Sequence, residues 1–129
     1  MYDGRIFRLA ASTEGGDVDS ATTFNYHQRG DVVWATYEGG AVHFGTLIAK
    51  VDAAGDLDMK YQHLSSDLTF KSGSCLSRCE RLEDGRIRLH ERWVWSGGAI
   101  GTGTSVIEEV TAADGPPSGW GSPRRDGMS

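Results

Sequence analysis

The segment best equipped for chemistry is the alternating stretch 86–95, because it places an acidic group among large apolar ones. If this stretch is a β-strand, every second side chain lies on the same face. One face then carries Ile87, Leu89, Glu91, Trp93 and Trp95, and the other carries Arg86, Arg88, His90, Arg92 and Val94. A buried carboxylate without a partner is costly, so Glu91 must be paired, protonated or functional.

Two interpretations of Glu91 carry equal weight. In an apolar cavity its pKa would rise, and it would act as a general acid or base or anchor a polar group of a ligand. Alternatively, it pairs with a basic group or a tyrosine hydroxyl of a neighbouring strand and has a structural role. Glu109 would share a proton with Glu91 if both faced inward, but for Glu108 and Glu109 a structural role is favoured.

Aromatic residues from other strands are expected to surround the same space. Tyr61 and His63 alternate with polar residues, and we expect Tyr61 to line a cavity and His63 to be a hydrogen-bonded core residue. His90 and Arg92 are expected on the solvated outer face. The expected ligand-binding set is Phe24, Tyr26, Tyr37, Tyr61, Trp93, Trp95 and Glu109. The expected catalytic set, if the protein is an enzyme, is Glu91, Tyr61 and His63.

Other kinds of site receive little support from the sequence. Cys75 and Cys79 would lie about 13 Å apart in one extended strand, so we expect no disulfide. Cys75 is a candidate nucleophile, but a small buried apolar role is favoured. The histidines have no short-spaced pair, so no metal site is expected. The glycine-rich segments 72–74 and 101–105 precede no predicted helix, so no phosphate cradle and no cofactor is expected.

Composition indicates a small acidic protein. The chain has 129 residues, with 13 Lys and Arg against 18 Asp and Glu, which gives a formal charge of -5. This length predicts one domain, and the negative charge argues against binding to nucleic acid or to an anionic membrane. No signal peptide is visible and no apolar run approaches the roughly 20 residues of a membrane span. We therefore expect a soluble cytoplasmic protein.

Glycine-rich turns separate segments that alternate with the period of a β-strand. Strands are predicted at 5–12, 22–28, 32–37, 41–51, 57–63, 68–81, 86–95 and 102–110. Such a series with short turns predicts an antiparallel meander, and closing it into a barrel removes exposed edges. The predicted fold is an all-β, single-domain barrel of about eight strands, similar in architecture to lipocalin-like or avidin-like barrels. A two-sheet sandwich is the alternative.

The domain is predicted to span residues 1–110, and a tail follows over 111–129. The tail is rich in Gly, Pro and Ser, and we expect it to be flexible. Trp120 is either an incidental aromatic residue or a plug over the barrel, and the incidental role is favoured.

Several motifs resemble those of a family of small bacterial proteins. They are TYEGG at 36–40, GTLI at 45–48, VDAAG at 51–55, LDMKY at 57–61, GSC at 73–75, GRIRLHERWVW at 85–95 and SVIEE at 105–109. In order and spacing, residues 5–110 resemble proteins labelled N-acetylglutamate synthase. An acetyl-CoA enzyme normally holds the pyrophosphate at a turn that opens a helix, and no such unit is predicted here. The resemblance therefore informs the fold.

Together these features favour a binding protein. It would hold a small, largely apolar or aromatic metabolite between Trp93, Trp95, Tyr61 and Phe24, with Glu91 as the polar anchor. The alternative is a cofactor-free isomerase, cyclase or lyase of small-molecule metabolism that uses Glu91 as general acid and base. A third class, a homodimeric module that packs its barrel wall on a partner, is also left open.

Overall fold

The computed structural model describes residues 1–111; the predicted tail and Trp120 lie outside the described residues. Eight strands and no helix occur within residues 1–111. The strands are β1 (Ile6–Ser12), β2 (Thr23–Arg29), β3 (Val32–Gly39), β4 (Val42–Val51), β5 (Leu57–Ser65), β6 (Phe70–Arg81), β7 (Ile87–Gly97) and β8 (Thr102–Glu109). Each predicted strand is present, and the bounds differ by only a few residues.

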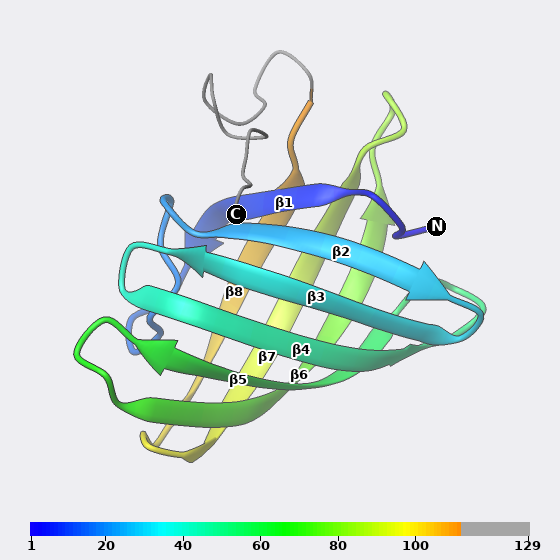
Figure 1. Ribbon diagram of the computed structural model, residues 1–129. Helices are drawn as coiled ribbons and strands as arrows, with labels where there is room; N and C mark the ends of the chain where they lie inside the picture. The colour runs from blue at the N-terminus through cyan, green and yellow to red at the C-terminus, as the bar shows by residue number, and fades with distance from the viewer. Residues whose placement is uncertain (112–129) are drawn as a thin grey trace, which may run out of the picture.

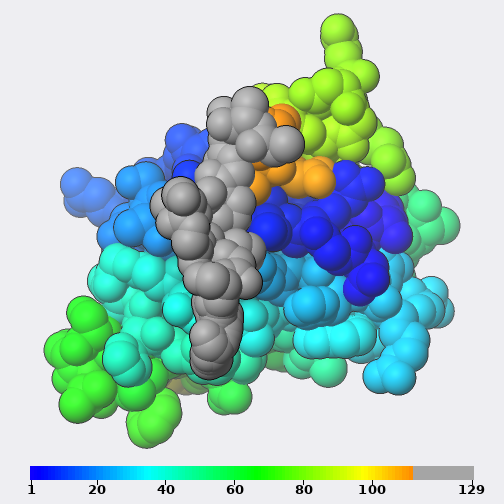
Figure 2. All heavy atoms as spheres, turned by 45° about the horizontal axis from the view of Figure 1, so that its top comes forward, coloured from blue at the N-terminus to red at the C-terminus, as the bar shows by residue number. Residues whose placement is uncertain are grey.

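The strands form one closed barrel in chain order, with every neighbouring pair antiparallel (Figure 1). Closure comes from pairing of β1 with β8, where Phe7 lies opposite Glu109 and Leu9 opposite Ile107. Figure 2 shows the N-terminal residues (blue) beside the end of β8 (orange) on the surface. Closure gives each strand two neighbours, so the all-β barrel prediction is confirmed and the sandwich alternative is wrong.

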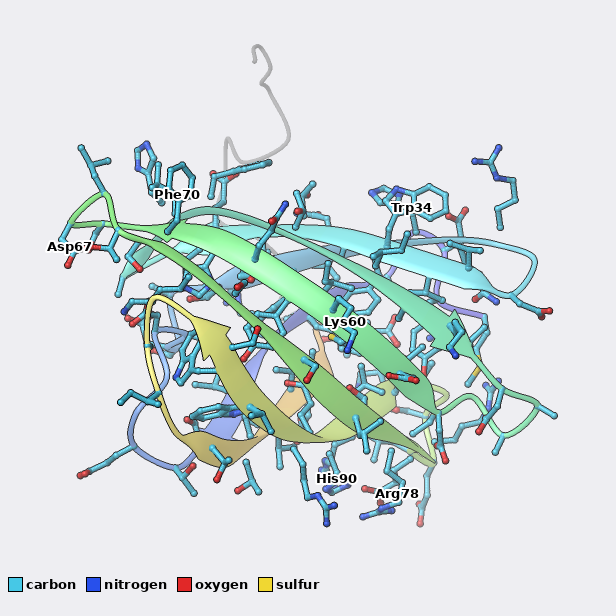
Figure 3. The ribbon with its side chains drawn as sticks, turned by 90° about the horizontal axis from the view of Figure 1, so that it is seen from below. Trp34, Lys60, Asp67, Phe70, Arg78 and His90 are labelled. Carbon is cyan, nitrogen blue, oxygen red and sulfur yellow. The ribbon has the colours of Figure 1, made fainter. Side chains whose placement is uncertain are left out.

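Alternation along β7 follows the predicted faces. Ile87, Leu89, Trp93 and Trp95 are all buried, whereas Arg92 and Val94 are exposed. His90 lies on the outer wall, where its Nε2 is 2.7 Å from Glu80 Oε1. Figure 3 shows the labelled outer side chains, including Trp34, Arg78 and His90, directed away from the barrel. The expected solvated role of His90 and Arg92 is therefore confirmed.

One end of the barrel, which we call the packed end, is filled with apolar side chains. Phe7, Leu89 and Ile107 are fully buried there. Residues 1–5 cross this end, and Tyr2 inserts its ring beside Phe7 and Tyr26, with ring centroids 6.5 and 5.8 Å away. The Tyr2 hydroxyl donates a hydrogen bond to the Gly55 carbonyl in the β4–β5 turn. The packed end is thus sealed by a core of aromatic and aliphatic groups.

The start of β6 differs from the prediction. The sequence predicts a strand from residue 68, but β6 begins at Phe70 because Leu68 adopts a positive φ of 67° in the preceding turn. This conformation is unfavourable for an L-residue and interrupts strand geometry.

Among the described residues, no helix is long and apolar enough to cross a membrane.

Candidate functional site

The opposite end, which we call the cavity end, contains an internal cavity of about 70 Å³. Aromatic and aliphatic groups form most of its wall, with a few polar groups among them. The lining residues are Ser12, Gly16, Asp17, Val18, Phe24, Tyr37, Leu47, Met59, Tyr61, His63, Cys75, Glu91, Trp93, Trp95 and Ser105. They come from all eight strands and from the loop between β1 and β2. This combination is typical of small-molecule sites.

Glycines on neighbouring strands seat three of the aromatic rings. Tyr37 lies opposite Gly45, Tyr61 opposite Gly73 and Trp93 opposite Gly103. A Cβ at any of these glycines would lie 2.2 to 2.5 Å from the facing ring. Because glycine has no side chain, each ring can lie flat across the adjacent strand. The three glycines therefore fix the positions of the aromatic rings that form the cavity wall.

Glu91 places a carboxyl group on the cavity wall. Its Oε1 accepts a hydrogen bond from Ser105 at 2.9 Å, and its Oε2 accepts one from Ser77 at 3.3 Å. The residue as a whole is half-buried, but its carboxyl lies deep among protein atoms. Burial raises the pKa of Glu91 from 4.5 to about 7, even though the two serine hydroxyls act in the opposite direction. The carboxyl can therefore gain or lose a proton near neutral pH.

The negative charge of Glu91 raises the pKa values of neighbouring hydroxyl and thiol groups. Burial, followed by the negative charge of Glu91, raises the pKa of the Cys75 thiol and of Tyr26. The same carboxylate contributes to the raised pKa values of Tyr37 and Tyr61, behind burial and other nearby groups. These hydroxyls and the thiol stay protonated, so Cys75 is poorly suited as a nucleophile.

Residues 13–22, the β1–β2 loop, cover the cavity end. β1 and β5 lie on opposite sides of an eight-strand barrel closed in chain order, so a loop that follows β1 and contacts β5 must cross the opening. The indole nitrogen of Trp95 donates a hydrogen bond of 3.0 Å to the Gly15 carbonyl. Gly16 packs on the Trp93 ring, where an added Cβ would lie 3.4 Å from a ring carbon.

Asp17 fastens this loop to β5 and β6. Its Oδ2 accepts hydrogen bonds from His63 Nε2 at 2.9 Å and from Ser65 at 2.7 Å, and Lys71 Nζ donates to Oδ1 at 3.0 Å. Burial alone would raise the pKa of Asp17, but these three bonds outweigh it and hold the pKa below its usual range. Tyr37 completes the network, since its hydroxyl lies 3.0 Å from His63 Nδ1. Both ring nitrogens of His63 are therefore engaged, as expected for a core histidine.

Most predicted site residues meet at this cavity. The structure brings together Phe24, Tyr37, Tyr61, His63, Glu91, Trp93 and Trp95. Two members of the predicted ligand-binding set lie elsewhere. Tyr26 is buried in the packed end beside Phe7. Glu109 pairs with Arg5 Nη1 at 2.5 Å and accepts a hydrogen bond from the Ile87 amide at 3.1 Å. Glu109 therefore closes the barrel seam and shares no proton with Glu91.

Several residues of the site carry no recognisable signal in the sequence. Asp17 stands in a loop with no alternating pattern, and Ser77 and Ser105 are small polar residues with no distinctive spacing. One signal is available: residues 13–22 form a connection much longer than the other turns, and long loops are often functional.

No group of three or more potential metal ligands occurs among the residues that the structure describes.

A family model described as "Avidin-like protein" matches residues 1–110. No curated protein and no solved structure matches the chain significantly. The match spans the whole barrel and all residues of the cavity, and it does not bear on the N-acetylglutamate synthase label.

Proposed function

This chain belongs to the avidin-like protein family, and from that premise we propose that it binds a small, largely apolar or aromatic metabolite inside the barrel. Trp93, Trp95, Tyr61 and Phe24 would form the walls of the site, and Glu91 would anchor a polar group of the ligand. A family of barrels that enclose small molecules makes binding the leading function.

One observation carries this proposal: the barrel interior is filled at one end and hollow at the other. The hollow is lined by aromatic rings and holds a carboxyl group. A cavity lowers stability because its lining atoms lose contacts. A ligand-binding site would explain why the protein keeps a cavity that lowers its stability. The three glycines that seat aromatic rings maintain this cavity.

The size of the cavity restricts the ligand. A dry cavity of about 150 Å³ in another protein binds benzene. With the loop in place, about 70 Å³ therefore holds roughly three or four non-hydrogen atoms. A larger ligand needs the β1–β2 loop to move outward, which makes the contacts of Asp17 the gate to the site.

Pyrazole, a neutral planar ring only slightly larger than the closed cavity holds, is a suitable probe for this site and its loop. We expect saturable shifts of the Trp93 and Trp95 indole N–H resonances when it is titrated into the wild-type protein. Cys75→Phe places a ring in the cavity and should abolish these shifts. Leu76→Phe is the matched control, because Leu76 is the next residue on β6 and is 56% exposed on the outer wall. Shifts that are equal in both variants, or the absence of shifts in the wild type with every small probe tested, would contradict the proposal.

A cofactor-free isomerase, cyclase or lyase is the second candidate, favoured by the pKa of about 7 at Glu91. A carboxyl group that titrates near neutral pH is suited to moving a proton in either direction. Glu91→Gln would then retain substrate binding and lose turnover. A catalytic role for His63 is less suitable, because Asp17 and Tyr37 occupy both of its ring nitrogens. Cytoplasmic location, bacterial origin and a homodimer stay predictions of the sequence.

A further inference from the structure

The carboxylate of Glu91 has hydrogen-bond donors but no positive partner in the cavity. Ser77 and Ser105 donate to it, and neither carries a charge. No lysine or arginine belongs to the cavity lining within residues 1–111. The other cavity-end carboxylate, Asp17, does have a cation, since Lys71 Nζ lies 3.0 Å away. When Glu91 is ionised, its charge is therefore left uncompensated.

The aromatic walls also favour positive charge. The faces of indole and phenol rings are electron-rich and attract cations within about 6 Å of the ring centre. This attraction is already used at the cavity mouth, where Lys71 Nζ lies 5.7 Å from the centroid of the Trp95 ring. The inner rings of Tyr61, Trp93 and Trp95 lie edge to face, with centroids 5.7 and 5.9 Å apart. They surround the space beside Glu91, and the cavity lining within residues 1–111 contains no lysine or arginine.

Proton transfer from a neighbour cannot relieve the charge. Cys75, Tyr26, Tyr37 and Tyr61 have pKa values above their ordinary range. The field of Glu91 is among the causes in each case, so these groups stay neutral around the carboxylate. A neutral ligand would leave the ionised carboxylate unbalanced or require it to take up a proton from water, and an anionic ligand would add to the negative charge.

We propose that the cavity recognises a small organic cation with a planar, N–H-bearing head of the amidinium or guanidinium type, held by Glu91 between the aromatic rings. The serines occupy one lone pair on each carboxylate oxygen, so both oxygens keep acceptor capacity for a forked donor. This inference rests on the proposed binding function and adds the chemical class of the ligand. It also predicts that ligand binding releases a proton from Glu91.

Affinity for such a cation should follow the ionisation of Glu91. The groups that feel the charge of Glu91 are Cys75 from β6, Tyr37 from β3 and Tyr61 from β5 around the cavity, and Tyr26 from β2 in the packed end. All of them stay protonated at neutral pH. Asp17, His63 and Lys71 at the cavity mouth are common to the wild type and a Glu91 variant, so comparing the two at each pH isolates Glu91. With a pKa of about 7, affinity should rise about tenfold from about pH 6 to about pH 8.

Acetamidinium and acetamide provide a direct test, because they have the same shape and differ in charge. Titration calorimetry and the indole N–H resonances of Trp93 and Trp95 would measure both affinities. At about pH 8 we expect the wild type to prefer acetamidinium by at least about tenfold, since hydrogen bonds between charged partners are stronger than those of a neutral donor. Glu91→Gln should lose this preference. Glu80→Gln, which alters a carboxylate on the outer wall, should keep it.

Two results would overturn the inference. If acetamide binds as tightly as acetamidinium while pyrazole still shifts both indoles, the site takes neutral ligands and only the cation assignment fails. If acetamidinium, acetamide and pyrazole all fail to bind the wild type, the proposed function fails with it. A preference for acetamidinium that persists in Glu91→Gln would assign the cation to another group and would also overturn the inference.

Discussion

The two ends of this barrel are closed by segments that flank the same strand, yet they are closed by different chemistry. The segment before β1 carries Tyr2 across the packed end to Gly55, in the turn that precedes β5. The loop after β1 carries Asp17 across the cavity end to His63, near the end of β5. The residues on either side of β1 therefore cross opposite ends of the barrel, and both reach residues in or next to β5.

The packed end depends on burial of apolar surface. Tyr2 and Phe7 are fully buried, and the Phe7 ring packs at a tilt against Tyr26, with ring centroids 4.8 Å apart. The cavity end depends on charged hydrogen bonds around Asp17, which is 16% exposed through its side chain. Apolar packing is lost only when the whole end opens, whereas an ionic contact near solvent can exchange with water. The fold thus separates stability from access: the packed end holds the barrel together, and we expect the cavity end to open more readily.

Phe7 and Phe24 offer the sharpest test of this difference, because they are direct partners in the β1–β2 register. Phe7 packs at the filled end, whereas Phe24 faces the cavity. We expect Phe7→Ala to lower the free energy of unfolding by about 4–5 kcal/mol and Phe24→Ala by about 3 kcal/mol, since Phe24 has fewer contacts to lose. Urea denaturation measures both. Equal losses would show that the two ends are packed alike.

Glu91→Gln should stabilise the protein at alkaline pH. The folded-state pKa of about 7 lies above the ordinary 4.5, so the folded protein holds an extra proton between these values. The contribution of the Glu91 carboxyl to the free energy of unfolding is fully present below about pH 4.5, and it is lost as the pH rises through about 7. Because glutamine resembles the protonated form, the variant should be more stable than the wild type by about 3 kcal/mol at about pH 8.

The same pair of proteins should be nearly equal in stability below about pH 4.5, where Glu91 is protonated in both folded and unfolded states. Denaturant unfolding across this pH range measures the difference. A gap that does not change with pH would mean that Glu91 is not desolvated in the folded protein. Glu80→Gln on the outer wall is the control and should show no such rise near neutral pH.

Asp17→Asn should loosen the loop more than it destabilises the barrel. The substitution removes the charge that pairs with Lys71, and we expect a loss of about 1–2 kcal/mol because the site is near solvent. Hydrogen exchange of the Trp95 indole N–H, which donates to Gly15, should speed up about tenfold. The Asp17 pKa lies below 3.8, so the wild-type contribution is present above that pH and is lost as the pH falls through the folded-state value.

Unchanged exchange at Trp95 would mean that the loop does not depend on Asp17. Exchange at the amide of Leu89, in the packed end, is the internal control and should follow global unfolding only. Asp58→Asn is a matched variant, because Asp58 forms an exposed ion pair with Lys50 on the outer wall. It should leave both exchange rates unchanged.

The fold was predictable from the sequence because its signals are local. Alternation with period two fixed the inward face of β7, and Glu83-Asp84-Gly85 and other glycine-rich turns marked the ends of strands. The inward position of Glu91 followed from its neighbours Leu89 and Trp93. Barrel closure followed from the need to protect edges. Each of these inferences uses residues that are close together in the chain.

The site was only partly predictable because its key contacts join distant residues. Nothing near Asp17 in the sequence indicates that it reaches His63, 46 positions later. Glu109 shares the alternation of an inward residue, but it lies at the end of β8, where Arg5 draws it to the barrel seam. Alternation gives the face of a residue, but not its height along the barrel. Height separates Glu109 and Tyr26 from the cavity.

The smallest expected effects come from two tyrosine hydroxyls, one at each end. Tyr26 is buried, and its hydroxyl has no hydrogen-bond partner within the described residues. Tyr37 is buried too, but its hydroxyl contacts His63 Nδ1 at 3.0 Å and donates to the Gln62 carbonyl at 3.3 Å. Removing an unsatisfied buried polar group relieves a desolvation cost, whereas removing a satisfied one leaves its partners unpaired. Replacing tyrosine by phenylalanine should therefore change the free energy of unfolding in opposite directions at the two ends.

We expect Tyr26→Phe to raise the free energy of unfolding by about 1 kcal/mol and Tyr37→Phe to lower it by about 1 kcal/mol. Urea denaturation at a single pH measures both, and the two variants control for each other because each loses one hydroxyl from a buried ring. If Tyr26→Phe were destabilising, its hydroxyl would be making a hydrogen bond in solution. The packed end would then contain a polar contact of its own, and the contrast between an apolar end and a polar end would be weaker than the ring contacts of Tyr2, Phe7 and Tyr26 imply.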